Sequence, residues 1–218
     1  AAQRVQRFAE AEGSGALKTP VLAAKLSTTV LLTDPFNEDA LRESEDPRSE
    51  TMSALHERLV RDKVVGEEQS LHGRAHAASP GDIRGMLADA SAFYSLGFSR
   101  FFGSIGAGRF ASQDLRHVAL LALFDRAIND GSFRRQTKTG STRTPQELAA
   151  EDAFSLALIA AFRGVMCTVL AVAPVPVALG MRCLEAFARE MREGRTIGKA
   201  MERLLVLTAP AGVRHARP

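Results

Sequence analysis

The longest apolar run of the chain is residues 153–187, AFSLALIAAFRGVMCTVLAVAPVPVALGMRCLEAF. Its least polar part, residues 164–181, is just long enough to cross a bilayer as a helix. Pro174 and Pro176 interrupt it, and a proline inside a helix removes a backbone donor and breaks the hydrogen-bond ladder. We therefore predict two helices that are joined at residues 173–176 and buried together as a hairpin. A single membrane pass is the alternative.

Length and composition indicate an ordinary globular domain. The 218 residues are enough for one domain with a sizeable core, and 45% of them are hydrophobic. The net charge of +3 is too small to indicate a nucleic-acid partner, and one tyrosine with no tryptophan supplies little for base stacking. Cys167 and Cys183 both lie in the apolar run, which favours buried thiols over a disulfide framework.

Proline punctuation predicts a helical protein. Four capping residues each precede a proline, a pair typical of a helix start: Asp34-Pro35, Asp46-Pro47, Ser79-Pro80 and Thr144-Pro145. Apolar spacing then predicts helices over residues 49–72, 80–104, 112–131, from 144 to the proline break, from there to Gly194, and 197–207. Residues 16–32 fit a helix, although Thr28-Thr29-Val30 also permits a strand.

We find no period-2 alternation typical of strands, so the predicted fold is all-α. It is a single-domain helical bundle built around the long apolar hairpin. Residues 1–50 are expected to be an N-terminal extension, residues 51–207 the helical domain and residues 208–218 a polar tail.

Candidate catalytic and metal-binding groups are weak, so we predict neither an enzyme nor a metal site. His72 and His76 have the spacing of two ligands on a helix, but Gly73 makes a regular helix there doubtful. The glycines at 103, 106 and 108 would follow a helix, whereas a dinucleotide-binding loop follows a strand. The cysteines lie in apolar surroundings, and paired acids such as Glu67-Glu68 and Glu151-Asp152 lie in charged ones.

Residues 134–143, RRQTKTGSTR, are basic and rich in turn formers, which predicts an exposed loop. Clustered basic side chains engage carboxylates and anionic membrane surfaces favourably. The partner-binding residues that we predict are Arg134, Arg135, Lys138 and Arg143. A solvated loop without a partner is the alternative.

Three stretches follow one another along the chain: AFYSLGFSRFF at residues 92–102, DLRHVALLALFDRAINDGSFRR at 114–135 and VALGMRCLE at 177–185. In this order they resemble the thylakoid-formation family, plastid and cyanobacterial proteins tied to photosystem II biogenesis. The matching helices of that family carry F-A-L-G, an Ala-Leu pair before an acidic turn, and A-I-G-L running into Leu-Glu. Residues 55–72 resemble an earlier helix, so the resemblance covers about residues 55–190.

The resemblance implies a non-catalytic helical protein of the chloroplast that is associated with the thylakoid, with a peripheral position favoured over a membrane-spanning one. It would bind photosystem or antenna proteins in a large complex, as an assembly factor or an accessory subunit, with the basic loop in the contact or at the membrane surface. No cofactor is predicted, and a pigment or lipid at the interface is left open. Two other readings are a single-pass accessory subunit of an organellar membrane complex and a helical carrier of an apolar ligand. Phe98, Phe101 and Phe102 would be either partner anchors or core residues.

Overall fold

The computed structural model describes residues 28–39, 50–66, 70–73, 78–98, 100–128 and 152–209. A five-stranded parallel sheet lies at its centre, in the order β2-β1-β3-β4-β6. Its strands are β1 (Thr29–Thr33), β2 (Ser70–His72), β3 (Ala92–Leu96), β4 (Leu120–Phe124) and β6 (Cys167–Leu170). A two-stranded parallel sheet pairs β5 (Ala127–Ile128) with β7 (Val175–Pro176).

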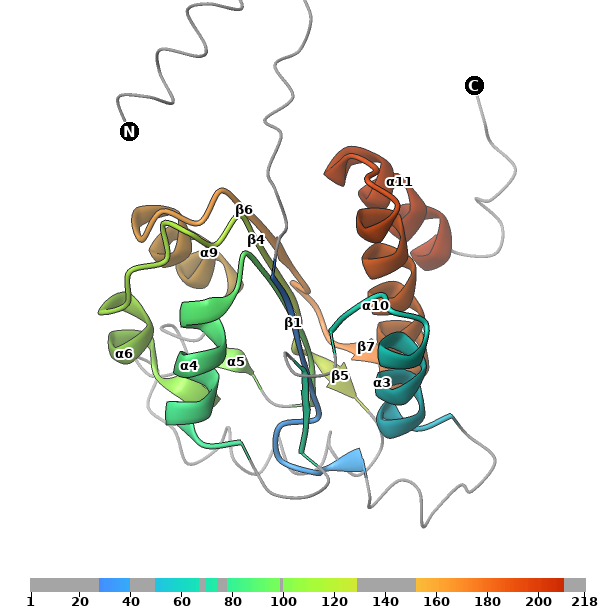
Figure 1. Ribbon diagram of the computed structural model, residues 1–218, viewed down its shortest axis with the longest axis horizontal. Coiled ribbons are helices and arrows are strands. Elements are labelled where there is room, and N and C mark those ends of the chain that lie inside the picture. Colours follow the sequence, from blue (N-terminus) through green and yellow to red (C-terminus); the bar gives the residue numbers. More distant parts are fainter. Residues whose placement is uncertain are drawn as a thin grey trace, which may run out of the picture.

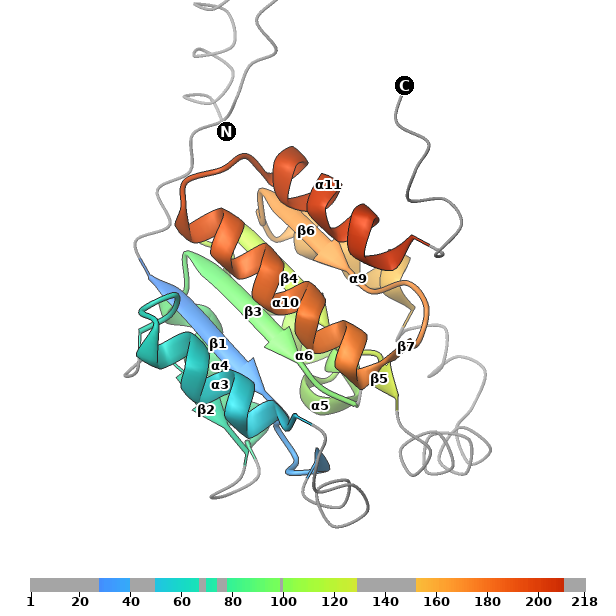
Figure 2. The same ribbon diagram turned by 90° about the vertical axis from the view of Figure 1, so that its right-hand side faces the viewer.

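Helices cover both faces of the large sheet, which is seen edge-on in Figure 1. On one face lie α4 (Pro80–Asp89), α5 (Phe101–Ile105), α6 (Ala107–Ala111) and α9 (Ala153–Phe162). On the other lie α3 (Met52–Arg61), α10 (Val177–Arg192) and α11 (Ile197–Thr208), and Figure 2 shows this layer from the front. The fold is therefore a three-layer α/β sandwich.

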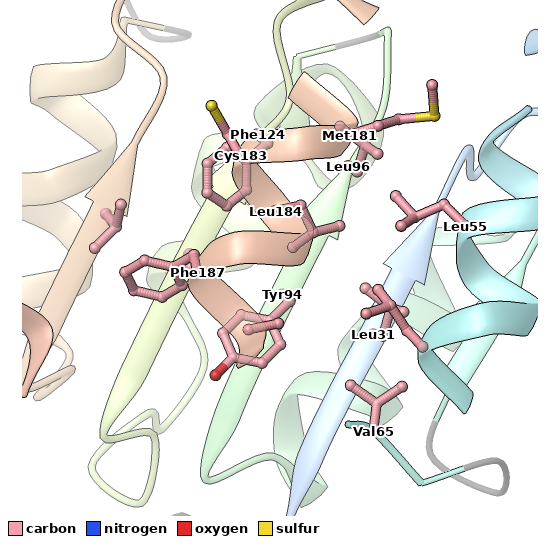
Figure 3. Close-up of a cluster of buried hydrophobic side chains, with 14 of the residues drawn as sticks. Leu31, Leu55, Val65, Tyr94, Leu96, Phe124, Met181, Cys183, Leu184 and Phe187 are labelled. Atoms are coloured by element: carbon pink, nitrogen blue, oxygen red, sulfur yellow. The ribbon is translucent and has the colours of Figure 1, made fainter. Parts of the chain in front are cut away.

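The two helical layers explain the composition of the strands. All five residues of β3 and all five of β4 are buried, because a parallel sheet with helices on both sides has no solvated face. On the α10 side, the Phe187 ring packs edge-on against Tyr94, at a centroid distance of 6.1 Å, and near Phe124, at 6.3 Å (Figure 3). On the α4 and α9 side, Phe93 and Leu121 join a second apolar cluster.

The predicted all-α fold is wrong. The predicted helix over residues 80–104 is α4 followed by β3 and α5, and the one over 112–131 contains β4 and β5. The helix expected over 49–72 ends at Arg61 and is followed by β2. Strands that are buried on both faces do not alternate, so the missing period-2 pattern was no argument against a sheet.

The long apolar hairpin is wrong as well. Residues 153–187 form α9, then the edge strand β6, then β7 and the first turns of α10. Gly164 has a φ of +95°, a left-handed conformation that suits glycine. It follows the C-terminal cap of α9, so the helix ends there and the chain turns toward β6. No helix among the described residues is long and apolar enough to span a membrane.

Other boundaries were predicted correctly. Ser79 caps α4 as expected: its hydroxyl accepts from the Asp82 amide, and the Asp82 carboxylate accepts from the Ser79 amide. The helix after the proline break is α10, and the last predicted helix is α11.

The domain start predicted at residue 51 leaves out β1, which pairs with both β2 and β3. Most of the predicted tail lies outside the described residues.

Candidate functional site

The strand order places the expected ligand site at the carboxyl ends of β1 and β3. In open parallel sheets, ligands bind where successive connections leave for opposite faces of the sheet. Here the connection after β1 leads through α3 on one face, and the connection into β3 leads through α4 on the other (Figures 1 and 2). The residues that follow β1, β3 and β4 therefore form the first candidate site.

Asp34 follows β1 and shapes the loop behind it. Its φ of 43° is left-handed, and its two carboxylate oxygens accept from the amides of Glu38 and Asp39, both at 2.8 Å. The amide of Asp34 donates to the Leu96 carbonyl at 2.8 Å. Burial raises the pKa of Asp34, although the two amides act in the opposite direction. This carboxyl group therefore organises its own loop.

The other buried acids at this end also hold backbone in place. Asp39 is buried and accepts from the Met52 amide at 2.6 Å, which ties the first loop to the start of α3. Asp125 follows β4 and accepts from the Phe101 amide at 2.8 Å, at the start of α5. Its pKa is raised, mainly by burial. Each acid is thus bonded to an amide donor of the fold.

Close contacts join the loops that follow β1, β3 and β4. A methyl group added to Gly97 would lie 3.2 Å from Pro35 Cδ, so the loops after β1 and β3 are packed together. The Gly97 amide donates to the Phe124 carbonyl at 3.3 Å, and its carbonyl accepts from the Ala127 amide at 3.1 Å. Among the described residues, these contacts pack the loops after β1, β3 and β4 against one another.

A polar cluster lies beside this crevice, at the β2 edge of the sheet. Thr33 Oγ1 lies 2.9 Å from Nδ1 of His56 on α3 and 3.0 Å from Nδ1 of His72 on β2. The ring centroids are 5.7 Å apart. Thr33 is fully buried, and burial, with His72 as the next cause, lowers the pKa of His56 to about 4.

The structure describes only some of the predicted site residues. Arg134, Arg135, Lys138 and Arg143 lie outside the described residues, as do His76, Glu67, Glu68 and Glu151. His72 has His56 as its neighbour, and nothing in the sequence pattern connects these two residues. Among the described residues, no three His, Cys, Asp or Glu side chains form a group that could hold a metal ion.

The remaining predicted candidates have structural positions. Gly106, with a φ of 79°, separates α5 from α6. Phe98, Phe101 and Phe102 are buried core residues rather than exposed anchors. Burial raises the pKa of both cysteine thiols, which disfavours the reactive thiolate form. Asp152 caps α9 by accepting from the amides of Phe154 and Ser155.

An apolar surface on α9 was missed, because the sequence suggested a buried hairpin. Leu156 and Ala160 face the sheet and are buried, whereas three large side chains are exposed on the opposite side of the helix. The exposed fraction is 69% for Phe154, 44% for Leu158 and 85% for Phe162. Residues four apart lie one above the other on a helix, so these three form a continuous stripe, called here the α9 stripe.

A charged recess of about 380 Å³ lies between the end of α10 and α11. It is lined by Glu190, Arg195, Lys199, Glu202, Arg203 and Val206. Lys199 and Glu202 are 2.9 Å apart and form an ion pair within it. The recess mixes both signs of charge on exposed side chains, so it has no clear ligand preference.

Comparisons with known proteins return no relative: no family model, no curated protein and no solved structure matches the chain. The resemblance to the thylakoid-formation family therefore stays a prediction. Two of its three stretches contain the strands β3 and β4, where helices were expected.

Proposed function

We propose that this chain is a non-catalytic docking domain that binds another protein of a larger assembly through the α9 stripe. The observation that carries the proposal is the exposure of Phe154, Leu158 and Phe162 on one face of one helix. Contiguous exposed apolar side chains on a folded domain are typical of interaction sites. Their spacing fits a partner helix laid along α9.

The geometry at the carboxyl ends of the strands supports a non-catalytic role. Asp34, Asp39 and Asp125 are buried and bonded to backbone amides, and the loops after β1 and β3 pack against each other. An acid that holds a loop in this way is not positioned for proton transfer to a substrate. The buried sheet would then serve as a rigid platform for α9.

The composition of α9 favours a protein partner over a lipid surface. Helices that lie on anionic membranes carry Lys and Arg on their polar face. No charged residue occurs within α9, AFSLALIAAF, and its N-terminal cap is the acidic Asp152. Burying one aromatic side chain against a partner contributes about 1.5–3 kcal/mol, so two such anchors can dominate an interface.

The identity of the partner rests on the resemblance alone. That resemblance names photosystem or antenna proteins in the chloroplast, with this chain as an assembly factor or accessory subunit. Isolation of the native complex from the source tests it, and co-migration with another kind of assembly would remove the photosynthetic partner while leaving the docking role. The helical carrier and the single membrane pass depended on the apolar hairpin and are not proposed.

The α9 stripe is tested by replacing Phe154 and Phe162 together with serine. The partner recovered with the wild-type protein should bind roughly a hundredfold more weakly, because two apolar anchors are lost. The matched control is Leu205→Ser on α11, which is 66% exposed and lies in the other helical layer. The control should recover the same partner at wild-type affinity.

Circular dichroism and urea unfolding show whether both variants keep the fold. If the double variant is folded and binds the partner as tightly as the wild type, the docking role of the stripe is wrong. If the wild-type chain instead sediments as a dimer that the double variant abolishes, the occupant is a second copy rather than another protein.

A further inference from the structure

The cluster of Thr33, His56 and His72 joins three elements of the fold. Thr33 is the last residue of β1, His56 lies on α3 and His72 is the last residue of β2. Both imidazoles contact the same hydroxyl oxygen through Nδ1, at 2.9 and 3.0 Å. The adjacent amide of Gly73 donates to the Thr33 carbonyl at 3.2 Å. Side-chain bonds therefore help to hold β2 and α3 on β1.

A hydroxyl between two imidazoles has one hydrogen to donate. With both rings neutral, Thr33 donates to Nδ1 of one ring and accepts from the Nδ1–H of the other. One added proton keeps both hydrogen bonds. The ring that accepts from the Thr33 hydroxyl stays neutral, and the ring whose Nδ1–H donates to Thr33 becomes an imidazolium. With a second proton, both rings carry an Nδ1–H and donate to the Thr33 oxygen. The buried hydroxyl hydrogen of Thr33 then has no acceptor in the cluster. The second proton also places two positive rings 5.7 Å apart.

We infer that Thr33, His56 and His72 form a proton-operated latch, which holds β2 and α3 on β1 with up to one bound proton and releases them when both imidazoles are protonated. Opening would expose the unpaired edge of β1 and free the loop that begins at Asp34. This regulation concerns the β2 edge and does not depend on the α9 stripe.

The charges around the cluster are consistent with this behaviour. His72 is close enough to the Asp34 carboxyl to act on its pKa, and the charge of Glu57, the next residue on α3, acts to raise the pKa of His56. Asp39 lies beside Asp34 in the same loop. On α10, which packs on α3, Glu185 and Arg189 pair with Arg58 and Asp62. Burial and the neighbouring His72 both lower the pKa of His56, so protonation of His56 is the step that the folded cluster disfavours.

The sign of the pH effect follows from His56. Its pKa is about 4 in the folded protein and 6.5 in an open or unfolded chain, so the opened form binds the proton more tightly. The latch contribution is complete above pH 6.5 and is lost as the pH falls toward 4. At pH 5 this difference in the pKa of His56 favours opening by up to ~30-fold relative to neutral pH. Partial exposure of the His56 ring reduces the expected change to roughly tenfold.

The experiment measures amide hydrogen exchange in residues 70–73 and imidazole titration by NMR between pH 7.5 and 4.5. In the wild-type protein, protection of these amides, corrected for intrinsic exchange, should fall roughly tenfold between pH 7.5 and pH 5. His56→Asn keeps a hydrogen-bonding group near Thr33 but cannot take the second proton, so its protection should change less than about twofold. The control is His117→Asn, since His117 contacts the Leu87 carbonyl on the opposite face; its profile should match the wild type.

Imidazole titration in the wild-type protein keeps the inference falsifiable if His56→Asn does not fold. One ring of the pair should titrate far below the other. Two rings that both titrate near pH 6.5 would overturn the latch, and so would an equal acid loss of protection in wild type and His56→Asn. Partner binding through the α9 stripe is measured separately, so failure of one proposal leaves the other standing.

Discussion

The two edges of the central sheet are stabilised in different ways. At the β2 edge, a three-residue strand is held by the Thr33 cluster, and α3 above it is tied to α10 by ion pairs. At the β6 edge, a four-residue strand lies between the apolar helix α9 and the apolar faces of α10 and α11: Val169 joins the cluster of α10 and α11, and Leu170 packs with that of α9. Charge and protonation should therefore govern the first edge, and side-chain volume the second.

The two roles proposed above belong to different edges: the pH response to the β2 edge, and docking to α9 beside the β6 edge. The polar edge carries two imidazoles that share one hydroxyl, whereas α9 at the apolar edge has apolar side chains both toward the core and toward solvent. Exposed apolar side chains that lie next to one another on a folded domain are typical of interaction sites, which is the basis of the docking proposal. The following substitutions test the contrast, from the largest expected effect to the smallest.

Leu156→Ala should cause the largest loss of stability. Leu156 is 3% exposed and, with Ala160, fixes α9 to the sheet. A buried leucine replaced by alanine costs about 2–4 kcal/mol, through lost burial and the cavity left behind. Urea unfolding at pH 7.5 measures the change. Leu158→Ala on the outer face should cost less than about 0.5 kcal/mol, and equal losses for the two variants would show that α9 is not packed as described.

Thr33→Val should have an intermediate effect at the polar edge. The substitution keeps the shape of the side chain but leaves two imidazole nitrogens without their shared partner. We expect a loss of about 1–2 kcal/mol in the free energy of unfolding at pH 7.5. Thr33→Ser keeps the hydroxyl and should lose clearly less. If valine is tolerated as well as serine, the hydroxyl does not hold the edge.

Glu185→Gln should have the smallest effect of the three. Glu185 is partly buried on α10 and accepts from Arg58 of α3 at 2.8 Å and from Arg189 at 3.0 Å. Loss of its charge should cost about 0.5–1 kcal/mol, and the difference from wild type should shrink in high salt. The control is Glu202→Gln, whose exposed pair with Lys199 should contribute almost nothing. A salt-independent difference would mean that packing rather than charge explains the effect.

The sequence predicted the parts of the fold that local chemistry determines. The Ser79 capping box, the start of α10 after Pro176 and the end of that helix near Gly194 all depend on neighbouring residues, and all three are present. The strands could not be recognised in the same way. LLALF in β4 and AFYSL in β3 are short apolar runs, and periodicity cannot distinguish a strand buried on both faces from a turn of buried helix.

The side-chain clusters of the described residues could not be predicted for a related reason, because tertiary contacts define them. Asp34-Pro35 has the local signature of a helix cap, yet Asp34 follows a strand and binds the amides of its own loop. His56 and His72 meet through Thr33 only because β1 and β2 are neighbours in the sheet. The spacing of Phe154, Leu158 and Phe162 indicated that these residues share one face of a helix. Nearly every residue of α9 is apolar, however, so the sequence did not indicate which face would be exposed.

Photocrosslinking from the α9 stripe tests the docking proposal most directly. A benzoylphenylalanine side chain is introduced at Leu158, in the middle of the stripe, and separately at Leu205 as the control, in cells that assemble the native complex. The account predicts that illumination links position 158 to one partner protein and that position 205 gives no such adduct. A partner linked from position 205 and not from 158 would contradict it, as would a fully assembled complex with no adduct from position 158.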